Sequence, residues 1–217
     1  MSDAYAFDRL PLDDIRPGTT VLVTGPRHEG ARELGLRLLA GPAGEGAIVV
    51  TTNRRAERVA ADCERIGIRV SDDRTAILDC VGQEDDDDVP AQVLPVSGPA
   101  DLTGIGMRFS DVYVDFNGDG IECVRTGLFS LSTLLSFGDL QTVSRFVHTL
   151  VGRIDSVGGL GALLIDPASH DEQAIRTLSQ FCGGRVEVRD GDGGPELRAR
   201  GLSDQPEGWL PFDRSPR

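Results

Sequence analysis

The hydrophobic pattern divides the chain into short apolar runs and longer segments in which apolar positions recur every three or four residues. The runs are rich in β-branched residues, which predicts buried parallel strands at residues 19–24, 47–52, 75–81 and 161–166. A short extended segment is expected at 93–96, and the stretch 121–131 contains a further strand. We therefore expect a sheet whose strands are separated by helical segments.

The segments between these strands have apolar residues on one helical face. The expected helices lie at residues 31–39, 56–66, 102–116, 140–154 and 175–181. Near the C-terminus the pattern alternates at 185–189 and 196–200 around a Gly-Asp-Gly-Gly turn, which predicts a hairpin. This order predicts an α/β fold, a three-layer, mostly parallel sheet with helices on both faces and a C-terminal antiparallel hairpin.

The chain divides into a lead-in at 1–18, one domain at 19–201 and a flexible tail at 202–217. The lead-in is polar but carries Phe7, Leu10 and Leu12, which we expect to pack on the edge of the domain. The tail is rich in proline, and its Trp209 and Phe212 are expected to dock on the body or on a partner.

The turn between the first strand and the first helix has the most specific spacing in the chain. Four residues separate Gly25 from Gly30, as in the phosphate-binding P-loop G-x-x-x-x-G-K-[S/T]. Ala31 replaces the lysine that reaches the phosphates, and Arg32 replaces the hydroxyl that holds Mg²⁺. The candidate nucleotide-binding residues are Gly25, Pro26, Arg27, His28, Glu29, Gly30, Ala31 and Arg32.

Two interpretations of Arg32 remain open at this point. It is either a surface charge on an amphipathic helix or a side chain whose bulk fills the magnesium site. Guanidinium groups bind phosphate well, so Arg27 and Arg32 could support ATP or ADP binding, whereas Glu29 opposes it. We expect no obligatory cofactor.

The charge of the chain is strongly acidic, with a formal net charge of -13 and no lysine among its 22 basic residues. This composition resembles that of proteins from halophilic archaea. In molar salt the Debye length is roughly 3 Å, so the acidity acts only at short range. No basic stripe or aromatic run indicates nucleic-acid binding, which we therefore do not expect.

Cysteine spacing and the N-terminus indicate the compartment. Cys63, Cys80, Cys123 and Cys182 lie far apart, which argues against a zinc site or a disulfide framework. The first residues lack the features of a signal peptide, and no apolar run is long enough for a membrane span. We expect a cytoplasmic protein without membrane contact.

Other candidate groups have plainer structural explanations. The acidic run 85–88 is expected to be a solvated loop, and the pair His170 and Asp171 a helix cap more readily than metal ligands. Asp166 ends a strand where α/β sheets place their sites, but Pro167 favours a turn. Asp79 lies inside a strand, where we expect it to form hydrogen bonds across the sheet.

The element order and several phrases resemble the RecA/KaiC-like ATPase superfamily, and in particular the short single-domain KaiC-like proteins of haloarchaea. The phrases are the degenerate P-loop at 25–32 and the segments at 99–106, 129–135, 146–150 and 164–167. The resemblance implies a RecA-like, P-loop fold. It places Phe129 where the family has its magnesium-binding aspartate, and Thr51, Thr52 and Asn53 where it has the general base.

The loss of four catalytic roles at once predicts a pseudo-ATPase that acts in regulation or scaffolding through protein contacts. The resemblance implies a homo-oligomer or pairing with a RecA/KaiC-like paralogue as the partner. The alternative is an ATPase with a non-standard P-loop that uses Arg27 or Arg32.

Overall fold

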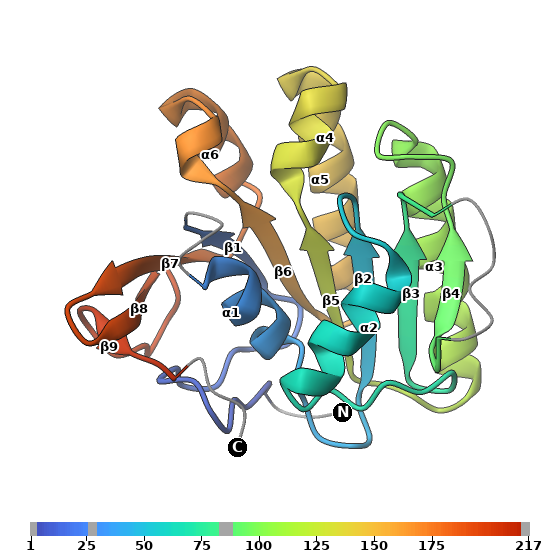
Figure 1. Cartoon of the computed structure of the whole chain (residues 1–217), viewed down its shortest axis with the longest axis horizontal. Coiled ribbons are helices and arrows are strands. Elements are labelled where there is room, and N and C mark those ends of the chain that lie inside the picture. Colours follow the sequence, from blue (N-terminus) through green and yellow to red (C-terminus); the bar gives the residue numbers. More distant parts are fainter. Residues whose placement is uncertain (1–3, 26–29, 83–88, 214–217) are drawn as a thin grey trace.

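The computed structural model describes residues 4–25, 30–82 and 89–213. Its centre is a nine-stranded sheet in the order β4-β3-β2-β5-β6-β1-β7-β8-β9 (Figure 1). The strands from β4 to β7 pair in parallel, and β8 and β9 are antiparallel. The strands are β1 (Thr20–Thr24), β2 (Gly46–Thr51), β3 (Thr75–Asp79), β4 (Gln92–Pro95), β5 (Val124–Phe129), β6 (Leu160–Ile165), β7 (Gly184–Gly191), β8 (Gly194–Arg200) and β9 (Leu210–Pro211).

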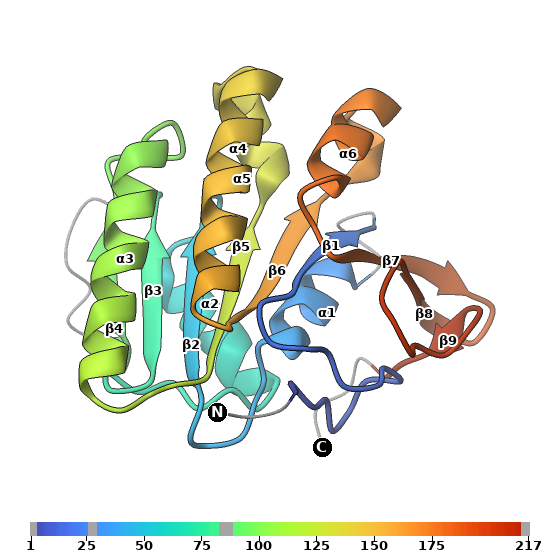
Figure 2. The same cartoon turned by 180° about the vertical axis from the view of Figure 1, so that it is seen from behind.

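Helices cover both faces of the parallel strands, which confirms the predicted three-layer fold (Figures 1 and 2). One core cluster contains side chains of α1 and α2, and the other contains side chains of α3, α4, α5 and α6. The helices are α1 (Ala31–Leu38), α2 (Ala56–Arg65), α3 (Leu102–Gly118), α4 (Leu131–Phe137), α5 (Leu140–Ser156) and α6 (Glu172–Ser179).

Helix α4 is the main element that the hydrophobic pattern did not predict. It begins directly after β5 and is only seven residues long, too short for a helical period to stand out from the apolar strand before it. Gly138 ends it, and Asp139 then caps α5, accepting a hydrogen bond from the Thr142 amide. The two helices are therefore separate elements.

The N-terminal segment packs under the amino ends of the strands. Tyr5 and Ile15 form a β-bridge, and Leu10 and Leu12 are buried as expected. The C-terminal segment also contacts the body, because β9 pairs with β8 and Phe212 is buried. No helix in the described part of the chain is both long and apolar enough to cross a bilayer.

Candidate functional site

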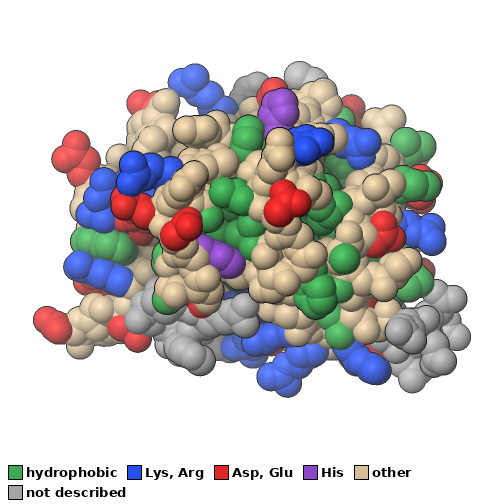
Figure 3. All heavy atoms as spheres, turned by 90° about the horizontal axis from the view of Figure 1, so that it is seen from above, with side chains coloured by type: hydrophobic (Ala, Val, Ile, Leu, Met, Phe, Trp, Pro, Cys, Tyr) green, Lys and Arg blue, Asp and Glu red, His purple; other side chains and the backbone are tan. Residues whose placement is uncertain are grey.

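A cavity of about 250 Å³ lies at the carboxyl edge of the sheet, beside the predicted P-loop. Figure 3 looks onto this edge, where charged side chains of both signs are interspersed with hydrophobic ones. Parallel α/β sheets place their ligand sites at this edge. The cavity is lined by Gly25, Ala31, Arg32, Asn53, Arg54, Ser130, Leu164 and Asp166.

Only part of the predicted loop can be placed. Pro26, Arg27, His28 and Glu29 lie outside the described residues, so their expected role stays a prediction. Gly30 precedes α1 with φ of 85°, a left-handed conformation that glycine adopts without strain. Ala31 begins the helix and is fully buried. The strand and the helix predicted on either side of the glycine spacing are therefore present.

Arg32 is held against Phe129 inside the site. The guanidinium carbon lies 5.1 Å from the centroid of the Phe129 ring, and the Arg32 side chain is only 13% exposed. The arginine is therefore not a surface charge. Its bulk lies beside the end of β5, and the interpretation that it fills a magnesium site stays a prediction.

The Phe129 ring fits because two glycines make room for it. A Cβ atom at Gly35, in the middle of α1, would lie 2.6 Å from Cε1 of the ring. A Cβ atom at Gly127, on β5, would lie 2.5 Å from Cε2. Glycine inside a helix is unfavourable by itself, so Gly35 is the sequence signal that could have indicated a large buried side chain here.

Asp62 on α2 lies close to three arginine side chains beside the cavity. Its carboxylate lies 2.6 Å from Arg54, 3.4 Å from Arg65 and 3.8 Å from Arg32. The sequence analysis did not single out Asp62, because it lies on a helix far from every recognised motif. Cys63, next to it, is buried, and this burial raises its pKa to about 12 although the charge of Arg32 opposes the shift.

The end of β2 carries hydroxyl groups in place of the expected carboxylate. Thr52 Oγ1 accepts a hydrogen bond from the Ser130 amide at 2.8 Å and donates one to the Phe129 carbonyl at 3.0 Å. Thr51 Oγ1 donates to the Arg54 carbonyl. These hydroxyls tie the ends of β2 and β5 to backbone groups, which is a structural role.

Arg32 and Phe129 offer no ligand for Mg²⁺. A magnesium ion takes oxygen ligands in octahedral geometry, whereas these two side chains present a guanidinium and a phenyl ring that lie against each other. Within residues 4–25, 30–82 and 89–213, no group of three or more His, Cys, Asp or Glu side chains is placed to hold a metal ion.

The remaining candidate carboxylates are used in capping. Asp79 accepts hydrogen bonds from the amides of Ala56, Val81 and Gly82, at distances of 2.7 to 3.0 Å. It therefore caps α2 and a loop, and these local bonds replace the cross-sheet bonds that we expected.

Asp166 and Asp171 have the predicted local roles. Asp166 accepts a bond from the Ala168 amide at the turn, and Asp171 accepts one from the Ala174 amide at the start of α6. The acidic run 85–88 lies outside the described residues.

Residues 18–188 match the profile of the Family of unknown function (DUF7504). The chain belongs to this family. Among curated proteins, none matches the sequence.

Two solved structures from Pyrococcus horikoshii have the same fold. KaiC-like protein PH0186 is 18% identical with a TM-score of 0.65, over 99% of this chain and 94% of that one. Uncharacterized protein PH0321, solved with an unknown peptide, is 14% identical with a TM-score of 0.64, over 85% of this chain and 84% of that one. The chain therefore has a RecA/KaiC-like fold, as predicted.

Proposed function

We propose that this protein is a RecA/KaiC-like pseudo-ATPase, a scaffolding or regulatory protein that acts through protein contacts and without ATP turnover. The observation that carries the proposal is the stacked pair of Arg32 and Phe129. The pair stands where the RecA/KaiC-like resemblance puts the magnesium-binding hydroxyl and aspartate. Phosphoryl transfer depends on positioning and charge neutralisation by such groups, which this pair would replace.

The position of the general base supports the same conclusion. The resemblance puts this base at the end of β2, where the hydroxyls of Thr51 and Thr52 are engaged with backbone carbonyl groups. A threonine hydroxyl held in this way does not accept a proton from water at neutral pH. The site would therefore lack both the metal and the base of a hydrolase.

The cavity favours a second candidate function, metal-independent binding of ATP or ADP. Arg32 and Arg54 both line it, and guanidinium groups recognise phosphate. Asp62 and Asp166 lie at the same place and reduce the net positive charge. Binding without turnover would make the protein a nucleotide-responsive regulator, whereas an ATPase that uses Arg27 or Arg32 would require measurable turnover.

The test is steady-state ATP hydrolysis by the full chain in about 2 M KCl, with Mg²⁺ and with EDTA. We expect no turnover above background in either condition. Magnesium-dependent turnover that Arg27→Ala or Arg32→Ala abolishes would establish the ATPase alternative. Arg176→Ala on α6, an exposed arginine away from the cavity, is the matched control.

The proposal also includes the compartment of the protein and its partners. The acidic, lysine-free composition favours a cytoplasmic protein of a halophilic archaeon. The expected partners are copies of the same chain or a RecA/KaiC-like paralogue.

A further inference from the structure

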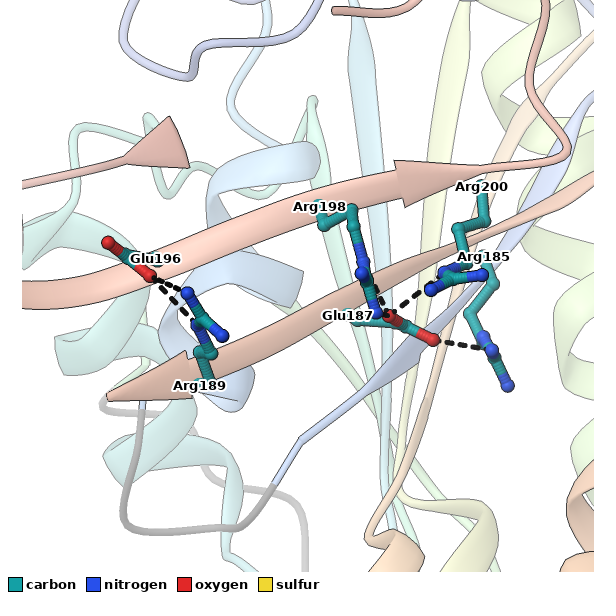
Figure 4. A network of polar contacts seen from close by, with 6 residues as sticks. All are labelled: Arg185, Glu187, Arg189, Glu196, Arg198 and Arg200. Atoms are coloured by element: carbon teal, nitrogen blue, oxygen red, sulfur yellow. Dashed lines mark hydrogen bonds and ion pairs between the residues drawn. The ribbon is translucent and has the colours of Figure 1, made fainter. Parts of the chain in front are cut away.

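The outer face of the terminal hairpin is covered by charged side chains. Val186, Val188 and Leu197 point into the core cluster that α1 shares. The alternate residues of β7 and β8 lie on the opposite face, beyond the helices that cover the rest of this side (Figure 2). This surface, the arginine face, consists of Arg185, Glu187, Arg189, Glu196, Arg198 and Arg200 (Figure 4).

The arginine face has more positive than negative charge. Glu187 pairs with Arg185, with Arg198 at 2.5 Å and with Arg200 at 3.2 Å. Glu196 pairs with Arg189 at 2.8 Å. Two carboxylates thus stand against four guanidinium groups. This leaves a local excess of positive charge in a chain whose net charge is -13. The side chains of Arg189 and Arg200 are about half exposed, at 49% and 52%, so this charge is accessible.

Trp209 gives the arginine face an aromatic element. Its ring lies 4.2 Å from the guanidinium carbon of Arg189 and 4.4 Å from that of Arg198. Stacking of this kind fixes the two arginines in place while Arg189 donates to Glu196 and Arg198 donates to Glu187. Tryptophan and arginine are the residues most enriched among energetically important contacts at protein interfaces.

The other end of the sheet carries the complementary surface. Helix α3 packs there with Ile105, Phe109 and Val112 in the core. Its outer face, which we call the α3 face, consists of Met107, Arg108, Asp111, Val114 and Asp115, so its two carboxylates outnumber its one guanidinium group.

The α3 face is both apolar and acidic. Met107 and Val114 are 62% and 70% exposed, which is unusual for large apolar side chains. Asp111 and Asp115 are exposed, and neither is in an ion pair with any residue of the described ranges. Exposed apolar residues beside unpaired carboxylates suit a partner that presents guanidinium and aromatic groups.

We propose that the arginine face of one copy docks on the α3 face of a second copy. Asp111 and Asp115 would receive the guanidinium groups that Glu187 and Glu196 leave unbalanced, and Met107 and Val114 would pack against Trp209 and the arginine stems. This inference rests on the proposed role in protein contacts and names the surfaces that make the contact.

The location of the two faces determines the kind of assembly. The hairpin and α3 lie at opposite ends of the molecule (Figure 1), so a contact between them is head-to-tail. Each copy in such a pair still has one unused face, and association continues until a ring closes or a filament forms.

Sedimentation of the full-length protein at rising concentration, in about 0.2 M and about 2 M KCl, tests this assembly. The parent should form species larger than a dimer. Arg200→Glu and Asp115→Arg should each weaken self-association by at least about tenfold. The exposed pair Arg176 and Glu172 on α6 offers matched controls, because Arg176→Glu and Glu172→Arg should assemble like the parent.

A mixture of the two variants tests the contact between the arginine face and the α3 face most directly. Arg200→Glu keeps its α3 face and Asp115→Arg keeps its arginine face, so their mixture contains one parental contact. The other contact brings the two substituted positions together with opposite charges, and the mixture should therefore assemble more strongly than either variant alone. A mixture that stays monomeric, a parent that stays monomeric, or variants that assemble like the parent would each overturn the proposal. Circular dichroism and melting curves check folding, and Arg200→Gln replaces Arg200→Glu if the latter melts earlier.

ATP turnover on the same samples separates this proposal from the proposed function. Magnesium-dependent turnover would contradict the absence of catalysis and leave the association result unaffected. Loss of the head-to-tail contact would leave the absence of turnover standing.

Discussion

An arginine stacks on an aromatic ring at each end of strand β5, and the two arrangements differ in how completely they are closed. At the amino end, Arg125 is fully buried, and its guanidinium carbon lies 5.1 Å from the Tyr5 ring and 5.3 Å from the Phe7 ring. At the carboxyl end, Arg32 lies 5.1 Å from the Phe129 ring and lines a cavity of about 250 Å³.

The hydrogen bonds explain the difference between the two ends. Arg125 donates to Glu45 at 2.5 Å, to the Leu38 carbonyl at 3.1 Å and to the Ala6 carbonyl at 3.0 Å. Arg32 lies 3.8 Å from Asp62, a carboxylate that Arg54 already contacts at 2.6 Å. The same residue types therefore fasten the N-terminal segment at one end and line a cavity at the other.

The largest loss of stability is expected for a substitution of Arg125, at the amino end of β5. Arg125→Met should lower the free energy of unfolding by about 3–5 kcal/mol, because it leaves the Glu45 charge and two carbonyls without their buried partner. Denaturant unfolding at constant salt measures the loss. Arg176→Met, in an exposed ion pair, should change stability by less than about 0.5 kcal/mol. A similar small change for Arg125→Met would mean that the buried contacts contribute little.

A second variant tests whether the carboxylates near the cavity are structural. Asp79 is 2% exposed and accepts three amide hydrogen bonds. Asp79→Ala should lower the free energy of unfolding by about 2 kcal/mol, since the amides of α2 and the following loop lose their acceptor. Asp72→Ala, at an exposed position, is the control for loss of an aspartate. Unchanged stability in Asp79→Ala would contradict the capping role.

The equivalent substitution at the carboxyl end of β5 should cost less stability. Arg32→Met should lower the free energy of unfolding by no more than about 1 kcal/mol, because Asp62 keeps Arg54 and Arg65 and the methionine still packs on Phe129. The same denaturant series measures it beside Arg125→Met. A loss as large as that of Arg125→Met would show that Arg32 is a structural lock.

The smallest expected effect concerns the exposed arginine face. Burial raises the pKa of Glu187, but the hydrogen bond from Arg198 and the charges of Arg185, Arg198 and Arg200 outweigh it, so the pKa lies below the ordinary 4.5. A lowered folded-state pKa contributes stability above pH 4.5 that is lost as the pH falls through the folded value. Melting curves from pH 6 down should show this loss, and Glu187→Gln should reduce it. An unchanged acid profile in that variant would contradict the pairing.

The sequence was sufficient for the fold and insufficient for the contacts that Arg32 and Phe129 make. Hydrophobic periods predicted the strands and most helices because they reflect burial on one or both faces. The glycine spacing correctly predicted a strand that ends before Gly25 and a helix that begins after Gly30. The stacking of Arg32 on Phe129, and the charge of Asp62 beside it, depend on contacts between α1, β5 and α2, which no local pattern contains.

The most direct test of the account is a calorimetric titration of ATP and ADP into the full chain, in about 2 M KCl, with Mg²⁺ and then with EDTA. If Arg32 and Phe129 occupy the position of the cation, as we propose, any binding should have the same affinity in both conditions. The variant Gly30→Glu should abolish such binding if the loop is its site. Binding that is at least about tenfold tighter with Mg²⁺ would contradict the central claim, because the site would then hold a metal with its nucleotide.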